Sequence, residues 1–203
     1  PKRYAALAVA VALRAVLVNI GASGQMLAAG FTASIIVGYS SLNAVLAKKL
    51  VVIIGLIVGG LVGGLLGVLK YIFNINEVVS SIMLNYTFQY VISFFINTFF
   101  VDPVSRQSKE ISAASRLTLM DTMVGNLKMD IRLGISLALL TVVAVCFLLE
   151  KTTLGYELKA VGYSRSAAKY AGIKVGRSMV LCMMISGDLA GVAGVTYYLG
   201  YVG

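Results

Sequence analysis

The 203 residues contain no histidine, no tryptophan and only two cysteines. Without histidine, the sequence has no histidine-based catalytic triad, metal site or proton relay. Cys146 and Cys182 both lie in apolar runs, where cysteine is usually a small buried side chain, so we expect no disulfide and no metal site. Phosphate-binding loops and the HExxH and GxSxG patterns are absent too, and the few carboxylates are scattered. These absences argue against an enzyme and predict no cofactor.

Charge is also scarce. Charged residues make up 12% of the chain, whereas soluble domains typically carry about 25%. The formal net charge of +9 does not indicate nucleic-acid binding, because no basic stripe with interleaved aromatic residues is present. We interpret the Lys and Arg residues as marking membrane boundaries, since 59% of the chain is hydrophobic and its mean hydropathy is +0.92.

One long apolar run supports the same interpretation. Residues 50–69 are all Leu, Val, Ile or Gly, and they are flanked by Lys48, Lys49 and Lys70. At about 1.5 Å per residue, a helix of this length is about 30 Å long, which matches the hydrocarbon thickness of a bilayer. The sequence therefore predicts a membrane-spanning helix here.

Six apolar segments follow one another: residues 4–20, 26–39, 50–69, 78–101, 133–149 and 179–202. Because these runs are continuous and do not alternate, they predict helices and not a barrel. The second segment is short, as expected of a half-length or broken span. We expect an all-α, polytopic transmembrane bundle forming a single domain over residues 1–203. Since the chain begins at Pro1 without Met and ends in an apolar run, we interpret it as truncated at both ends.

Two polar loops, residues 102–132 and 150–178, separate the later segments. If the second loop is cytoplasmic and the segments alternate, seven Lys and Arg residues lie inside and nine outside. This distribution does not satisfy the positive-inside rule, so charge alone leaves the orientation open.

Glycines recur at every fourth position of the third segment, at Gly55, Gly59, Gly63 and Gly67. Small residues at this spacing allow two helices to approach closely in lipid, so we interpret them as a packing face. Arg14 and Asp188 are charges within apolar segments, where charge is costly. We assign neither of them a role.

The fourth segment carries a polar ridge, defined as Ser81, Asn85, Gln89, Ser93 and Asn97, which lie four residues apart. Each step of four drifts about 40° around a helix, so the ridge slants along it. Asn76 is expected to cap the helix start. Buried amides need partners in hydrocarbon, so the ridge predicts either hydrogen bonds between helices or a lining for an uncharged polar solute. Tyr86 flanks the ridge and would belong to that lining.

A second polar stretch, Asn19-Ile20-Gly21-Ala22-Ser23-Gly24-Gln25, lies between the first two segments. Its glycines permit backbone conformations that end a helix. The stretch is either a helix break at membrane depth or an ordinary turn at the membrane surface. In the first case Asn19, Ser23 and Gln25 would face the solute path, because broken helices expose backbone groups to a cavity.

Residues 150–178 resemble a docking surface. Ser164 is expected to cap a short helix over residues 165–171, and Gly172 to end it. Ala167 and Ala168 would provide a smooth face bordered by Arg165, Lys169 and Tyr170. Such a helix fits a groove in a partner protein, and the alternative is contact with anionic lipid headgroups.

Several of these motifs together resemble a known family. Residues 19–27, NIGASGQML, resemble the NIGxEGQ stretch of permeases in bacterial ABC importers, in the subgroup for nucleosides and simple sugars. Residues 76–86, NEVVSSIMLNY, and residues 152–162, TTLGYELKAVG, are similar to two further motifs of that subgroup. Residues 167–173 and 186–191 extend the similarity over most of the chain. Two positions depart from the pattern, because Ser23 replaces a usual Glu and Asp188 a usual small residue.

The resemblance implies a multi-pass protein of the bacterial plasma membrane. It implies that residues 102–132 are extracellular and that residues 150–178 are a cytoplasmic loop touching an ABC ATPase. A second permease chain, identical or not, and an extracellular solute-binding protein would be the other partners, with lipid around the spans. The residues expected to contact the ATPase are Gly155, Glu157, Arg165, Ala167, Ala168, Tyr170 and Gly172.

The predicted function is therefore that of a permease subunit in an ATP-driven importer of nucleosides or simple sugars. One alternative is an ion-coupled secondary transporter that uses the Asp188 carboxylate. A branched-chain amino acid permease is another, although the fourth segment offers no charge to a zwitterion. A membrane scaffold without transport activity is the third.

Overall fold

A computed structural model describes residues 2–14, 17, 19–38, 43–100, 118–124, 127–132 and 134–199. The helices are α1 Lys2–Arg14, α2 Ala22–Ala33, α3 Ala44–Phe73, α4 Glu77–Phe95, α5 Gly134–Lys151, α6 Thr153–Tyr163, α7 Arg165–Tyr170 and α8 Val175–Tyr198. Turns of π-helix extend α2 through Ser34–Gly38 and α4 through Ile96–Phe100. The expected helical bundle is confirmed. The strands β1 Thr118–Val124 and β2 Leu127–Arg132 add an antiparallel hairpin within the loop expected at residues 102–132.

Three helices in the described residues are long and apolar enough to cross a membrane: Leu46–Phe73, Glu77–Phe100 and Val175–Tyr198. A fourth span results if α5 and α6, which meet at a bend of 70°, are counted as one. The short second segment is confirmed as the apolar helix Ala22–Val37. The first segment, expected over residues 4–20 with an interruption at Arg14, is not one continuous helix: α1 ends at Arg14, and the described residues Leu17, Asn19 and Ile20 are not helical.

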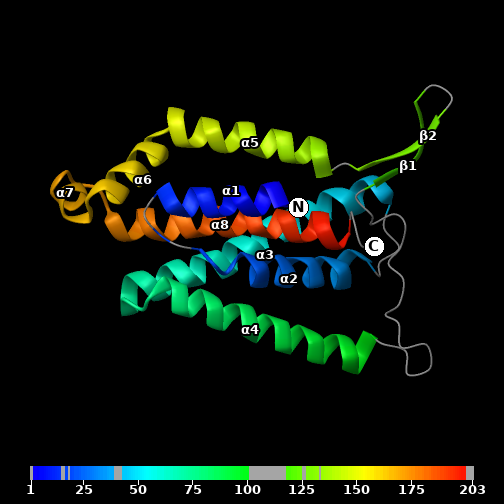
Figure 1. Cartoon of the computed structure of the whole chain (residues 1–203), viewed down its shortest axis with the longest axis horizontal. Coiled ribbons are helices and arrows are strands. Elements are labelled where there is room, and N and C mark those ends of the chain that lie inside the picture. Colours follow the sequence, from blue (N-terminus) through cyan, green and yellow to red (C-terminus); the bar gives the residue numbers. More distant parts are fainter. Residues whose placement is uncertain are drawn as a thin grey trace.

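Helix α8 lies at the centre of the bundle and packs against α3, α2 and α1 (Figure 1). Its contact with α3 is a glycine contact: a Cβ atom on Gly59 would lie 2.2 Å from the carbonyl oxygen of Gly187, and one on Gly191 would lie 2.0 Å from that of Gly55. Backbones this close leave no room for a side chain. The glycines therefore form a packing face, as their spacing predicts.

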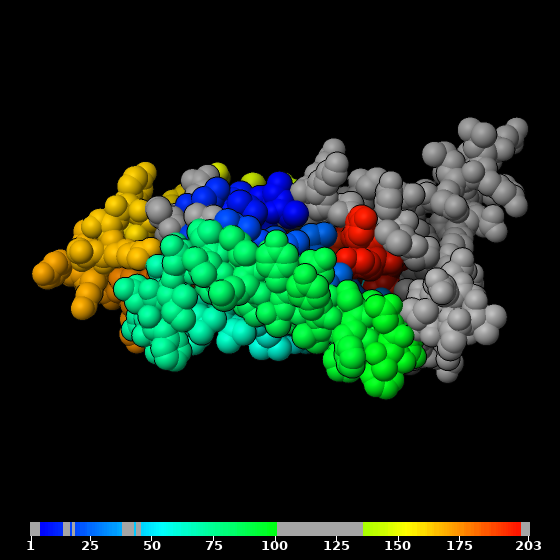
Figure 2. All heavy atoms as spheres, turned by 60° about the horizontal axis from the view of Figure 1, so that its bottom comes forward, coloured from blue at the N-terminus to red at the C-terminus, as the bar shows by residue number. Residues whose placement is uncertain are grey.

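Helices α4 and α5 lie on opposite outer sides of the bundle (Figure 1). In the most apolar stretch of the helix Glu77–Phe100, only 11% of the residues are buried within the described structure. Figure 2 shows its surface as a continuous green face of the molecule. Large apolar side chains such as Met83, Phe94 and Leu139 are exposed on these two helices. This exposure is compatible with lipid around them, because a bilayer solvates apolar side chains.

The two polar regions lie at opposite ends of the long axis. Helices α6 and α7 form one end, and the β1–β2 hairpin forms the other (Figure 1). The local signals that define the helix ends are confirmed: Asn76 Oδ1 accepts a hydrogen bond from the Val78 N–H at 2.9 Å, and Ser164 Oγ accepts one from the Ala167 N–H at 3.3 Å. Gly172 ends the α7 turn with φ of +82°, a conformation that favours glycine.

Candidate functional site

Between α1 and α2 the described residues Leu17, Asn19 and Ile20 are not helical, and the first two of them are buried in the bundle. Leu17 and Asn19 are both about 1% exposed or less. Helix α2 then starts at Ala22, where the N–H of Gln25 donates to the carbonyl oxygen of Gly21 at 3.0 Å. The polar side chain of Asn19 is thus enclosed by protein, whereas Ile20 is 43% exposed. The polar groups between α1 and α2 lie among α8, α3 and α4, and they need partners there.

Asn19 is the centre of this buried polar group. Its Nδ2 atom donates to Ser186 Oγ at 2.7 Å and to Gln25 Oε1 at 3.2 Å, and its Oδ1 atom accepts from the Gly21 N–H at 3.0 Å. Ser186 Oγ donates in turn to the carbonyl oxygen of Ala8 at 2.6 Å. Asn19 thus links α2 to α8, and Ser186 links α8 to α1, at the point where the chain passes from α1 to α2.

Gln25 is fully buried, and its Nε2 atom has no hydrogen-bond partner among the described residues. It is the one buried side-chain nitrogen or oxygen in that part of the chain without a partner. Leaving a buried donor unpaired costs about 1–3 kcal/mol, so this amide nitrogen is available to a water or to a polar solute that reaches it.

Asn85 connects α4 to the same interruption. Its Oδ1 atom accepts from the Gly24 N–H at 2.8 Å, and its Nδ2 atom donates to the carbonyl oxygen of Ile20 at 2.9 Å. A Cβ atom on Gly24 would lie 2.7 Å from Asn85 Oδ1, so the close approach requires glycine. Both atoms of the Asn85 amide are occupied by backbone groups of the interruption.

The polar ridge of α4 does not form one lining. Ser81 is buried and its hydroxyl donates to the carbonyl oxygen of Glu77, whereas Gln89, Ser93 and Asn97 are exposed on the described surface. The slant of the ridge explains this division, since each step of four turns the side chain by about 40° away from the core. The interpretation as hydrogen bonds between helices holds for Asn85.

Tyr86 and Ser23 lie on the exposed surface as well, and Gln25 does not. The ring of Tyr86 stacks on that of Tyr90, with centroids 6.5 Å apart. The structure thus brings together Asn19, Gln25 and Asn85 of the expected pathway residues. It leaves Ser23, Tyr86 and Gln89 outside this group.

Asp188 is half-buried where α8 meets α3. A Cβ atom on Gly60 would lie 2.1 Å from its Oδ1 atom, so the carboxylate occupies space that this glycine leaves open. Within the described residues, no group of three His, Cys, Asp or Glu side chains could hold a metal. The side chain of Arg14 lies outside the described residues.

Helices α6 and α7 carry the residues expected to contact an ATPase, and two of these are structural. Gly155 is buried at the bend between α5 and α6, where a Cβ atom would lie 2.4 Å from the carbonyl oxygen of Leu149. Glu157 Oε2 accepts a hydrogen bond from Ser178 Oγ at 3.1 Å and so ties α6 to α8. These contacts hold the α6–α7 end against the bundle.

Helix α7 has an inner and an outer face. Ala168 is 3% exposed and packs into the hydrophobic core, so the expectation that it forms part of an exposed smooth face is wrong. Helix α7 has only six residues and follows α6 directly after Ser164, so one of its sides packs against the bundle, and Ala168 lies on that side. Ala167, Arg165 and Tyr170 are exposed, and the Tyr170 side chain is 93% exposed.

Sequence reasoning missed Ser186 as a member of the polar group around Asn19. The available signal was a hydroxyl in the middle of the sixth apolar segment, where an unpaired polar group is costly. Its partner Asn19 is 167 residues away in the sequence, so no local pattern could identify the pair.

The sequence of this chain is similar to those of several known transport proteins. The profile of a family described as "Branched-chain amino acid transport system / permease component" matches residues 4–203. The nucleoside ABC transporter permease protein NupB of Lactococcus lactis is 38% identical over 211 residues. The guanosine ABC transporter permease protein NupP of Bacillus subtilis is 36% identical over 202 residues, and the glucose ABC transporter permease protein TsgB13 of Haloferax volcanii is 28% identical over 210.

The alignments cover 100%, 98% and 100% of this chain but 57%, 57% and 55% of the relatives. The chain therefore spans a little over half the length of the curated proteins that it matches. No solved structure matches it significantly.

Proposed function

Since this chain belongs to the family of branched-chain amino acid transport system permease components, we propose that it is the permease subunit of an ATP-driven importer whose solutes are nucleosides. The family is described as a transport-system permease component, which supports a transport subunit whose ATP hydrolysis would be carried out by a separate chain. The two relatives above 30% identity are named for nucleoside and guanosine transport, and this is what favours nucleosides over sugars.

The observation that carries the proposal is the uncharged polar group at the interruption between α1 and α2. It consists of Asn19, Gln25, Asn85 and Ser186. A nucleoside is neutral at physiological pH and offers base and ribose groups that amides recognise by hydrogen bonds. A zwitterionic amino acid would have to leave two charges unpaired beside these groups, which is costly in a low-dielectric site. The chemistry of the group therefore supports a neutral solute.

Gln25 is the residue in this group with hydrogen-bonding capacity to spare, because its Nε2 atom is buried and unpaired. We assign Asn19 and Asn85 a structural role, which is to fix the conformation of the chain between α1 and α2. The Asn19 amide is bonded to Ser186 of α8, and the Asn85 amide is bonded to the backbone of Gly24 and Ile20. Ser23, Ser81, Tyr86 and Gln89, which we also expected along the path, would act from the faces of α2 and α4. The solute would pass between α4 and parts of the transporter outside the described residues.

Coupling to an ABC ATPase would occur at the α6–α7 end. The exposed outer face of α7, with Ala167, Arg165 and Tyr170, is the surface that such a partner would contact. Gly155, Glu157 and Ala168 would support that surface from within, and the exposed Gly172 would end its helix. This assignment puts residues 150–178 in the cytoplasm and the β1–β2 hairpin outside the cell, where a solute-binding protein would deliver the nucleoside. A second permease chain would complete the pathway.

The decisive experiment is uptake of labelled guanosine and uridine by cells that carry the full-length transporter. It is run with and without excess ribose, and with the Walker lysine of the ATPase replaced. Uptake that needs the ATPase and that ribose does not compete supports the proposal. Competition by ribose would move the solute to simple sugars.

Uptake that is indifferent to the ATPase variant would instead support an ion-coupled transporter. In that case an ionophore should abolish uptake, and replacing Asp188 by Asn should do the same. The half-buried carboxylate of Asp188 beside Gly60 is the feature that favours this second function, and a broken helix would suit it as well.

A further inference from the structure

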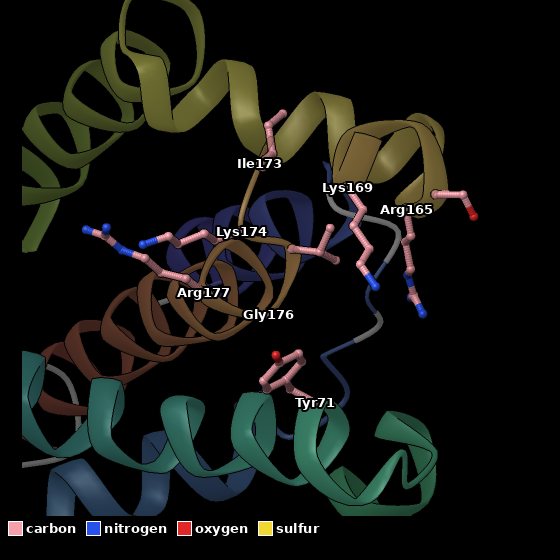
Figure 3. A pocket seen from close by; sticks show the side chains of 9 residues that line it. Tyr71, Arg165, Lys169, Ile173, Lys174, Gly176 and Arg177 are labelled. Atoms are coloured by element: carbon pink, nitrogen blue, oxygen red, sulfur yellow. The ribbon is translucent and has the colours of Figure 1, made fainter. Parts of the chain in front are cut away.

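A basic hollow lies where the spans α3 and α8 meet helix α7. Its volume is about 640 Å³, and it is lined by Tyr71, Arg165, Ser166, Lys169, Ile173, Lys174, Val175, Gly176 and Arg177. Among these lining residues there are four cations and no carboxylate. Figure 3 shows Arg165 and Lys169 reaching from α7 to one side, while Lys174 and Arg177 extend beside each other from the start of α8.

We infer that this hollow binds the phosphate group of an anionic membrane lipid. The four cations form two pairs that extend to different sides of the start of α8 (Figure 3), and an anion close to either pair relieves the repulsion between its two like charges. Glu77 is the carboxylate that acts electrostatically on Arg165, but it is already paired with Lys70 Nζ at 2.7 Å. Glu157, which accepts a hydrogen bond from Ser178 Oγ at 3.1 Å, is a further carboxylate beside the first turn of α8. The four cations of the lining still outnumber these neighbouring carboxylates, so the hollow has an excess of positive charge that a ligand can balance.

The position of the hollow favours a lipid over a soluble anion. It lies at the end of α3 and at the first turn of α8, and both helices are long enough to span a membrane. Tyr71, Ile72 and Phe73 at the end of α3 are each about 60% exposed, as is typical of side chains at the headgroup level. Basic pockets between spans at this depth are suited to lipid headgroups.

The lining chemistry also fits a lipid. The ring of Tyr71 packs directly on Gly176, where a Cβ atom would lie 2.3 Å from the ring, and Ile173 and Val175 add apolar surface. Cationic groups would hold the phosphate, and these apolar groups would contact the glycerol and the first acyl carbons. The first turn of α8 also faces the hollow, and the positive end of its dipole adds to the attraction.

The proposed ATPase contact shares Arg165 with the hollow, and its other two residues lie outside the hollow. Tyr170 and Ala167 are exposed and do not line the hollow, whereas Arg165 and Lys169 do. A bound lipid would thus support α7 from the membrane side while Ala167 and Tyr170 remain free to contact the ATPase. The inference depends on the proposed function only for the choice of the cytoplasmic leaflet.

The test uses the full-length permease in its assembled complex, in phosphatidylcholine nanodiscs with increasing phosphatidylglycerol. Tyr71→Trp places a reporter at the hollow, because this part of the chain has no tryptophan, and the signal of the unsubstituted complex is subtracted. We expect brominated phosphatidylglycerol to quench the reporter more strongly than brominated phosphatidylcholine. Native mass spectrometry of the unsubstituted complex provides a measurement that needs no reporter, and it should retain phosphatidylglycerol preferentially.

Removal of two charges, in Lys169→Gln with Lys174→Gln, should weaken phosphatidylglycerol binding about 30-fold, at the usual contribution of each basic residue near an anionic surface. The matched control is Lys151→Gln with Lys159→Gln, which removes the same charge at the same end of the chain but outside the hollow. That control should bind as the parent does. Lys169→Arg with Lys174→Arg keeps the charge and should also bind normally, which guards against misfolding of the first variant.

Equal quenching by the two lipids would overturn the inference, and so would equal loss of binding in both double Gln variants. Complete displacement of the lipid by inorganic phosphate would assign the hollow to a soluble anion instead. Loss of the ATPase subunit from Lys169→Gln with Lys174→Gln, with lipid binding intact, would assign it to the protein partner. None of these outcomes depends on transport, so failure of the nucleoside proposal can be distinguished from failure of this one.

Discussion

Replacement of Gly59 by Ala tests the central contact of the bundle. The added Cβ atom would lie 2.2 Å from the carbonyl oxygen of Gly187, whereas ordinary van der Waals contact begins at 3.4 Å. The helices α3 and α8 would have to separate by about 1.2 Å (3.4 − 2.2) to accommodate it. A gap of about 0.5–1 Å already forfeits a quarter to a half of the dispersion energy of the atoms that face it.

We therefore expect Gly59→Ala to lower the free energy of unfolding by about 1–3 kcal/mol, the usual cost of overpacking a tight contact. The matched control is Gly64→Ala on the same helix, whose Cβ would meet the flexible Met184 side chain at 2.9 Å. Both changes gain the same helix propensity, about 1 kcal/mol, so this gain cancels in the comparison. The difference between the two variants isolates the backbone clash.

The assay is the temperature at which the detergent-purified full-length permease loses its monodisperse elution profile, measured together with solute uptake. Gly59→Ala should unfold at a clearly lower temperature than Gly64→Ala. It should also lose uptake, because Ser186 adjoins Gly187 and would move relative to Asn19, to which it is bonded at 2.7 Å. Equal unfolding temperatures and equal uptake in the two variants would refute the reasoning.

Three further predictions concern single side chains. Asn85→Ala should lower the free energy of unfolding by about 1–2 kcal/mol, because it removes two hydrogen bonds to the backbone. Gln89→Ala should leave thermal unfolding unchanged, because Gln89 is exposed. An equal effect of both changes would contradict the finding that the polar ridge has a bonded part and an exposed part. Ala167→Trp should leave the unfolding temperature unchanged, because Ala167 is exposed, but should reduce solute-stimulated ATP hydrolysis in the assembled complex. Ala168→Trp should destabilise the protein, because Ala168 is buried. Normal coupling in Ala167→Trp would count against docking through α7. Ser164→Ala removes the cap of α7 and should cost about 1 kcal/mol of local stability, seen as faster amide hydrogen exchange in residues 165–170; unchanged exchange would show that packing alone holds this helix.

Much of the fold was predictable because its signals are local. The apolar run at residues 50–69 lies within α3, and the caps at Asn76 and Ser164 form the predicted hydrogen bonds. A span requires only enough consecutive apolar residues, and a cap requires only the right side chain next to free N–H groups. The glycine ridge was likewise identifiable as a packing face, although its partner helix was not.

The tertiary structure alone decided which way the polar groups face. Asn85 is bonded to the interruption between α1 and α2 whereas Gln89 is exposed, although both lie on the same predicted ridge. Ala168 is buried and its neighbour Ala167 is exposed. These outcomes depend on α8 lying between α1 and α3, and a packing arrangement is set by contacts between residues far apart in the sequence. Composition and periodicity therefore determined that this chain spans a membrane as helices, whereas the buried amide group and the basic hollow exist only because distant helices meet.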